Sequence, residues 1–125
     1  MGTALWVVQG LLAVLFLMVG VMKITQPIEK LAVRMAWVTR FSPSIVRLIG
    51  ALEVLAAIGL VVPALTGILP VLTPLAAVGL ILTMVGAMAT HATHGEYGNM
   101  AGNFVLLALA AFVAYGRFVL VPFPS

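Results

Sequence analysis

The sequence predicts an all-α polytopic membrane protein, an antiparallel four-helix transmembrane bundle with a short interfacial amphipathic helix between the first and second spans. Of its 125 residues, 64% are hydrophobic and only 7% are charged, whereas a soluble domain carries about 25% charged residues. A chain this short cannot bury so much apolar surface from water, which excludes an ordinary soluble protein. We therefore treat residues 1–125 as a single transmembrane domain.

Four apolar runs are each close to the roughly 20 residues that a membrane-crossing helix needs. Because an open-ended element in lipid must satisfy its own backbone hydrogen bonds, we interpret these runs as helices. The first run stops at Lys23, the second at Pro63 and the fourth at Pro122. The predicted spans are residues 4–22, 45–62, 71–90 and 101–121.

The connection between the first two spans predicts an amphipathic helix over residues 27–38. Pro27 suits the first turn of a helix, and Trp37 is typical of an anchor at the membrane surface. Apolar residues recur at helical spacing with two cations on the other face, which indicates a helix in the headgroup layer. The apolar set is Ile28, Leu31, Met35 and Val38, and the cations are Lys30 and Arg34. The alternative is a basic loop with accidental periodicity.

Charge is unevenly distributed, which predicts the orientation of the chain. Five of the six cations lie in residues 23–47, and Arg117 is the sixth. By the positive-inside rule this connection faces the cytoplasm, so the third connection does too and both termini face outward. We expect a multi-pass protein of the inner or plasma membrane with lipid as its surroundings. Six cations are too few for a nucleic-acid surface, so we expect no nucleic-acid partner.

Each predicted span carries one stripe of small and polar residues, which is typical of packed faces in membrane bundles. Because these stripes can pack together, they favour an antiparallel four-helix bundle. In order along the chain, the stripes are Gln9, Ala13, Phe16, Gly20 and Lys23; Gly50, Glu53 and Ala57; Gly79, Thr83, Gly86 and Thr90, extended by His94; and Asn99, Asn103, Ala110, Ala114 and Arg117.

Glu53 is the most informative single residue. It lies six positions beyond Arg47, roughly 9 Å deeper at 1.5 Å per residue. A charge at that depth costs at least about 2.5–3.5 kcal/mol and should be paired or protonated. Arg47 would lie about 120° around the helix, a poor position for pairing, whereas Lys23 ends the neighbouring antiparallel span at the same level. The pair could serve a ligand or proton site, or it could merely fix helix register.

These residues predict a polar pocket that opens toward the cytoplasm, with Glu53 at its floor. His91 and His94, with Glu96 nearby, could be interpreted as a metal site, but no third ligand follows a standard pattern, so we expect none. The two histidines could still relay protons near neutral pH. The expected pocket or ligand-binding residues are Glu53, Lys23, Gly50, Gln9, Thr83, Asn103, His91 and His94.

Several segments combine into a pattern that covers nearly the whole chain. They are Val21-Met22-Lys23-Ile24, Leu48-Ile49-Gly50-Ala51-Leu52-Glu53, Gly59-Leu60-Val61-Val62-Pro63, Leu72-Thr73-Pro74-Leu75-Ala76-Ala77-Val78-Gly79-Leu80 and residues 91–96. The most specific part is the G-x-x-E of Gly50 and Glu53 combined with Lys23 at the end of the first span. Together these segments resemble the DoxX-like membrane proteins. The resemblance implies four transmembrane helices and recurring family positions at Lys23, Gly50 and Glu53.

The wider group, as the resemblance implies, includes a quinone-linked subunit of thiosulfate oxidation and subunits of membrane thiol-redox complexes. The chain has no cysteine, so direct thiol exchange cannot be transferred to it. We expect an accessory or quinone/lipid-binding subunit of a membrane redox system, not catalytic on its own, with a quinone as candidate cofactor. An oxidoreductase partner and a homo-oligomer are expected. The alternatives are a small-solute or proton-coupled transporter and a structural membrane scaffold.

Overall fold

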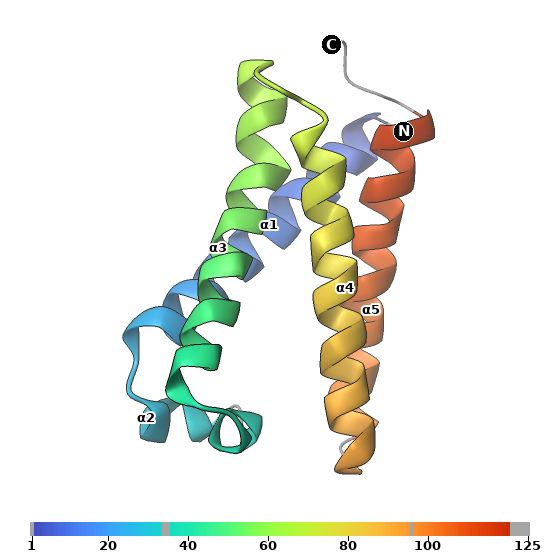
Figure 1. Ribbon diagram of the computed structural model, residues 1–125. Helices are drawn as coiled ribbons and strands as arrows, with labels where there is room; N and C mark the ends of the chain where they lie inside the picture. Colours follow the sequence, from blue (N-terminus) through green and yellow to red (C-terminus); the bar gives the residue numbers. More distant parts are fainter. Residues whose placement is uncertain (1, 34–35, 96, 121–125) are drawn as a thin grey trace.

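The computed structural model describes residues 2–33, 36–95 and 97–120, and it is dominated by four long helices (Figure 1). All four are long and apolar enough to cross a membrane, which confirms the predicted all-α four-helix class. The helices are α1 (Gly2–Thr25), α3 (Pro43–Thr66), α4 (Leu72–Thr93) and α5 (Tyr97–Tyr115), which continues as the π-helix η2 (Gly116–Leu120).

The bundle is built from two helix pairs. α1 packs along α3 and α4 packs along α5, while α3 contacts α4 to join the pairs. The connection between α1 and α3 and the turn between α4 and α5 lie at the same end of the molecule, the lower end in Figure 1. We call this the basic end because residues 23–47 contain five of the six cations. The α3–α4 turn lies at the opposite end.

A central apolar core joins the two pairs. It is made of buried side chains from α1, α3, α4 and α5, which fill the middle of the bundle. These residues are Leu12, Phe16, Ala57, Leu60, Ala77, Leu80, Met84, Ala110, Val113 and Ala114. Large aliphatic side chains from facing helices thus separate the basic end from the opposite end.

The interfacial segment differs from the single helix predicted over residues 27–38. It contains a short helix α2 (Ile28–Ala32) and a 3-10 helix η1 (Ala36–Arg40), while residues 34–35 and the side chain of Trp37 lie outside the described part. Leu31 and Val38 are fully buried and pack against Val46 of α3. The apolar periodicity is therefore satisfied by packing on the bundle and does not require one continuous helix.

The prediction that the second span ends at Pro63 is wrong, because α3 continues through Pro63 to Thr66 and ends at Gly67. Proline has no N–H and cannot bond the carbonyl four residues earlier, which here belongs to Gly59. The hydroxyl of Thr73, on α4, donates to this carbonyl at 3.0 Å. Membrane helices tolerate proline when a neighbouring side chain satisfies the freed backbone group in this way.

A network of buried polar side chains lies around the backbone hydrogen bond that Pro63 cannot make. The Gln9 side-chain amide on α1 donates from Nε2 to the Leu60 carbonyl at 2.8 Å, and its Oε1 accepts from Arg117 Nε at 2.7 Å. The Arg117 guanidinium also lies 5.5 Å from the centre of the Trp6 ring. Both Gln9 and Arg117 are buried. This proline-site network (Gln9, Leu60, Thr73 and Arg117) connects all four long helices near the opposite end.

Replacing Thr73 by valine is expected to destabilise the protein by about 1–3 kcal/mol, because it leaves the partly buried Gly59 carbonyl without a donor while the side-chain shape is kept. The measurement is reversible unfolding in mixed micelles. Thr25→Val is the control, since the exposed Thr25 hydroxyl donates to the carbonyl of its own helix at Val21 and its removal should cost little. Equal stability of both variants would contradict this role.

Candidate functional site

The site begins with a close contact between the backbones of α1 and α3. A Cβ built on Gly50 would lie 2.7 Å from the Gly20 carbonyl oxygen, and one built on Gly20 would lie 2.7 Å from the Gly50 carbonyl oxygen. Real Cβ atoms do not approach this closely, so only glycine fits at both positions. Each glycine comes three residues before a charged residue, Gly20 before Lys23 and Gly50 before Glu53. The contact therefore brings the two charges to one level.

Lys23 and Glu53 form the predicted ion pair. Lys23 Nζ lies 2.6 Å from Glu53 Oε1, and the two residues are only 7% and 2% exposed. Arg47, as expected, does not fill this role. Its Nη1 donates to the backbone carbonyls of Lys23 and Gln26 at 2.6 Å each, where the last turn of α1 leaves carbonyls without intrahelical donors.

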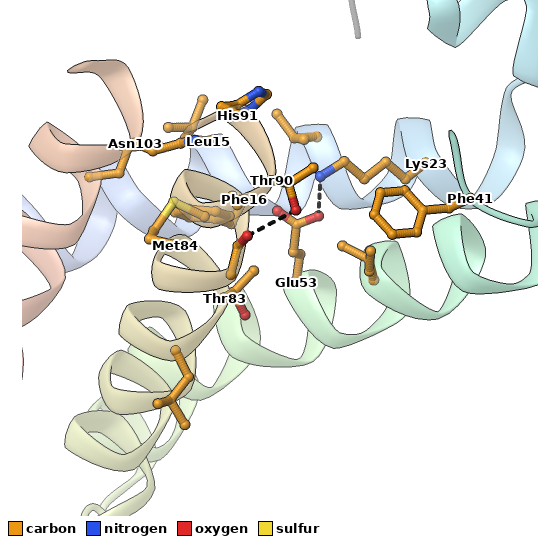
Figure 2. Close-up of a pocket in the computed structure, with 16 residues that line it drawn as sticks. Leu15, Phe16, Lys23, Phe41, Glu53, Thr83, Met84, Thr90, His91 and Asn103 are labelled. Carbon is orange, nitrogen blue, oxygen red and sulfur yellow. Dashed lines mark hydrogen bonds and ion pairs between the residues drawn. The ribbon is translucent and has the colours of Figure 1, made fainter. Parts of the chain in front are cut away.

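A cavity of about 440 Å³ lies beside this pair. It is bordered by the basic-end halves of α1, α3, α4 and α5 together with Phe41 from the connection (Figure 2). It is partly open, since Leu82 and Gly86 in its lining are exposed, and most of its lining is apolar. Its lining residues are Leu15, Phe16, Val19, Lys23, Phe41, Ile49, Glu53, Leu82, Thr83, Met84, Gly86, Ala87, Thr90, His91, Asn103 and Leu106. The cavity thus places a few polar side chains within a mostly apolar lining, between helices that are long and apolar enough to cross a membrane.

The polar groups of the cavity differ in how they are satisfied. The hydroxyls of Thr83 and Thr90 donate to carbonyls of their own helix, each at 3.0 Å. His91 is buried against the cavity wall. The side-chain nitrogen of Asn103 is buried and has no hydrogen-bond partner among the described residues. Among the described polar side chains that line the cavity, Asn103 therefore has an N–H group that no other described residue satisfies.

The structure brings five of the eight predicted pocket residues together at the cavity, namely Lys23, Glu53, Thr83, His91 and Asn103. The other three lie elsewhere. Gln9 belongs to the proline-site network, and Gly50 lies in the contact between α1 and α3. His94 is exposed, with its Nδ1 2.9 Å from the Thr90 carbonyl. In the part of the chain that the structure describes, no three potential metal ligands cluster; Glu96 lies outside it.

The stripe predicted for the third span is rotated relative to the real packing face. Gly79 and Gly86 are exposed, while the buried residues of α4 are Thr73, Pro74, Ala77, Leu80, Met84 and His91. One residue is a rotation of about 100° on a helix, so Leu80 faces the core where Gly79 was expected. The prediction failed here because the small residues with which α4 packs are Ala76, against Gly59 of α3, and Ala77 in the core, while the predicted glycines lie on another face.

The other stripes are largely confirmed. Gln9, Phe16, Gly20 and Lys23 are buried on α1, as are Gly50, Glu53 and Ala57 on α3. Ala110, Ala114 and Arg117 are buried at the end of the fourth span, whereas the side chain of Asn99 is not described. Sequence reasoning missed the apolar wall of the cavity, including Phe41 and Leu106, because isolated apolar residues carry no signal in an apolar chain.

A family model described as the DoxX-like family matches residues 7–113. No curated protein and no solved structure matches the chain significantly. The matched range contains the Gly20–Gly50 contact, the Lys23–Glu53 pair and every residue that lines the cavity. This small integral membrane protein therefore belongs to the DoxX-like family.

Proposed function

We propose that the protein binds a membrane-soluble amphiphile, with a quinone as the candidate, and acts as an accessory subunit of a membrane redox system. The cavity is the observation that carries this proposal. Its volume of about 440 Å³ lies within the roughly 300–1,000 Å³ that is usual for small-molecule sites. Apolar walls with a few polar groups are also what such sites present.

The polar side of the cavity suits a headgroup that gains and loses protons. Reduction of a quinone to a quinol consumes two electrons and two protons. A carboxylate, an ammonium and an imidazole line the same chamber, as Glu53, Lys23 and His91, and such groups can hold or transfer protons. Since the chain has no cysteine, we assign the supply of electrons to an oxidoreductase partner.

The central core argues against the transporter alternative. Buried Leu12, Leu80 and Val113 pack between the cavity and the proline-site network. A solute path across the membrane would have to open this apolar layer. The scaffold alternative accounts for the Lys23–Glu53 pair, but it gives no reason for a chamber beside that pair.

We further propose that the basic end faces the cytoplasm and that the protein forms a homo-oligomer. The cations Lys30, Arg40 and Arg47 at the basic end support this orientation through the positive-inside rule. Protease accessibility of tags placed at the N-terminus and in the α4–α5 turn would test the orientation, because opposite results are expected for the two tags. Cross-linking in native membranes would test self-association.

The proposed function is tested by purifying the protein from its native membranes with a mild detergent. Quinones are extracted and identified, and copurifying proteins are identified by mass spectrometry. Ala87→Phe should fill the cavity and abolish quinone retention, whereas Ala108→Phe is the matched control because Ala108 faces outward on α5. A wild-type protein free of quinone and oxidoreductase would contradict the proposal. Proton flux in liposomes that depends on Glu53 would instead favour transport.

A further inference from the structure

We infer that the cavity selects an uncharged ligand whose carbonyl oxygen accepts a hydrogen bond from the side-chain amide of Asn103. This inference rests on the proposed function, because it names the ligand class for the same cavity. It assigns a specificity-determining role to a residue on α5, across the cavity from the Lys23–Glu53 pair. Figure 2 shows Asn103 and Met84 on one side of the cavity and Lys23 and Phe41 on the other.

The charged groups of the cavity balance each other. The carboxylate of Glu53 and the ammonium of Lys23 are in direct contact at 2.6 Å and neutralise one another. A fatty-acid anion or an anionic phospholipid headgroup would add an unbalanced charge to a mostly apolar cavity, which is costly unless a partner for it is present. The pair therefore favours ligands without net charge.

The polar groups of the cavity differ in whether their hydrogen-bond donors are already used. The hydroxyls of Thr83 and Thr90 are already occupied by the carbonyls of Gly79 and Gly86. The buried nitrogen of Asn103 has no partner among the described residues, and buried donors in folded proteins are almost always bonded. A carbonyl oxygen of a ligand would supply the missing acceptor for the Asn103 side-chain N–H.

The side-chain amide of Asn103 is free to rotate about its outer torsion. The outer torsion of an asparagine side chain is broad and roughly two-fold, so the Asn103 amide can turn toward the cavity. It can present its N–H to a carbonyl or its oxygen to a hydroxyl. One residue can thus hold both the oxidised and the reduced form of a quinone-like headgroup, while Leu82 and Leu106 contact its apolar part.

The test uses the full chain in phosphatidylcholine nanodiscs, titrated with a short-chain benzoquinone, a C12 fatty-acid methyl ester and the matching fatty-acid anion. The wild-type protein should bind the quinone and the ester, and bind the anion at least about tenfold more weakly. Asn103→Leu should weaken binding of both carbonyl probes about tenfold or more. It should also raise the thermal midpoint of the ligand-free protein, because a buried amide without a partner is removed.

Ala108→Leu is the matched control and should leave all affinities unchanged, because Ala108 is exposed on α5 and does not line the cavity. Asn103→Ala repeats the test if the leucine variant does not fold. Quinone binding that is insensitive to both Asn103 variants would overturn the inference and leave the proposed function standing. If the ester bound in an Asn103-dependent way and the quinone did not bind at all, the proposed quinone function would be overturned and the inference about Asn103 would stand. Binding of neither carbonyl probe, or tighter binding of the anion, would also overturn the inference.

Discussion

Glu53→Ala is expected to destabilise the protein by about 3–5 kcal/mol, the largest effect of any single substitution considered. The change removes the carboxylate that neutralises Lys23, which is buried at 7% exposure beside an apolar cavity. The double variant Lys23→Ala with Glu53→Ala removes both charges and should recover most of this loss. Unfolding in mixed micelles, monitored by circular dichroism, gives the comparison directly.

The control for this comparison of single and double variants is the pair Glu29→Ala and Lys30→Ala, made singly and together. Both residues are exposed on α2, and exposed charges contribute little to stability, so neither the single nor the double change should move the transition appreciably. Equal destabilisation by the single and the double variants at positions 23 and 53 would refute the coupling. A neutral Glu53→Ala variant would refute it as well.

Gly50→Ala is expected to cost about 1–3 kcal/mol, although it adds only one methyl group. The new Cβ would lie 2.7 Å from both the Gly20 carbonyl oxygen and the Lys23 Cβ, so the helices must separate. The separation should also lengthen the Lys23–Glu53 contact and reduce ligand retention. Melting temperature and retained quinone are the two measurements.

Gly79→Ala is the matched control, since Gly79 is exposed in mid-helix and a Cβ added there would meet nothing within 4 Å. Alanine there should stabilise the helix by about 0.5–1 kcal/mol, because glycine loses more backbone entropy on folding. If both glycine variants changed stability by the same amount in the same direction, close packing of α1 on α3 would not be the cause.

Much of the fold could be predicted because the bilayer imposes simple rules. The length of each apolar run and the cost of an unpaired charge are enough to predict four spans and the Lys23–Glu53 pair. The end of α3 could not be placed, because Pro63 normally signals a helix end. The hydroxyl that makes its continuation tolerable, that of Thr73, lies on another helix. A rule based on local sequence has no access to that contact.

The candidate site was only partly predictable for a related reason. Polar residues are rare within apolar spans, so Glu53, Lys23 and Asn103 could be identified from the sequence as candidate pocket residues. The rotation of α4 depends on how Leu80 and Met84 fill the core, which small-residue spacing does not encode. The cavity itself is space between side chains from four helices, and no sequence motif describes it.

The ion pair also has a consequence for how the chain enters the bilayer. Lys23 and Glu53 are separated by 30 residues, so the ribosome completes the first span well before the acidic one emerges. Alone in lipid, the acidic span would carry an insertion penalty of about 2.5–3.5 kcal/mol. When α3 packs against α1, the Lys23–Glu53 ion pair offsets much of that insertion penalty. Biogenesis should therefore proceed by partitioning of a helical hairpin as one unit, with the glycine contact allowing the two segments to associate before the remaining half is synthesised.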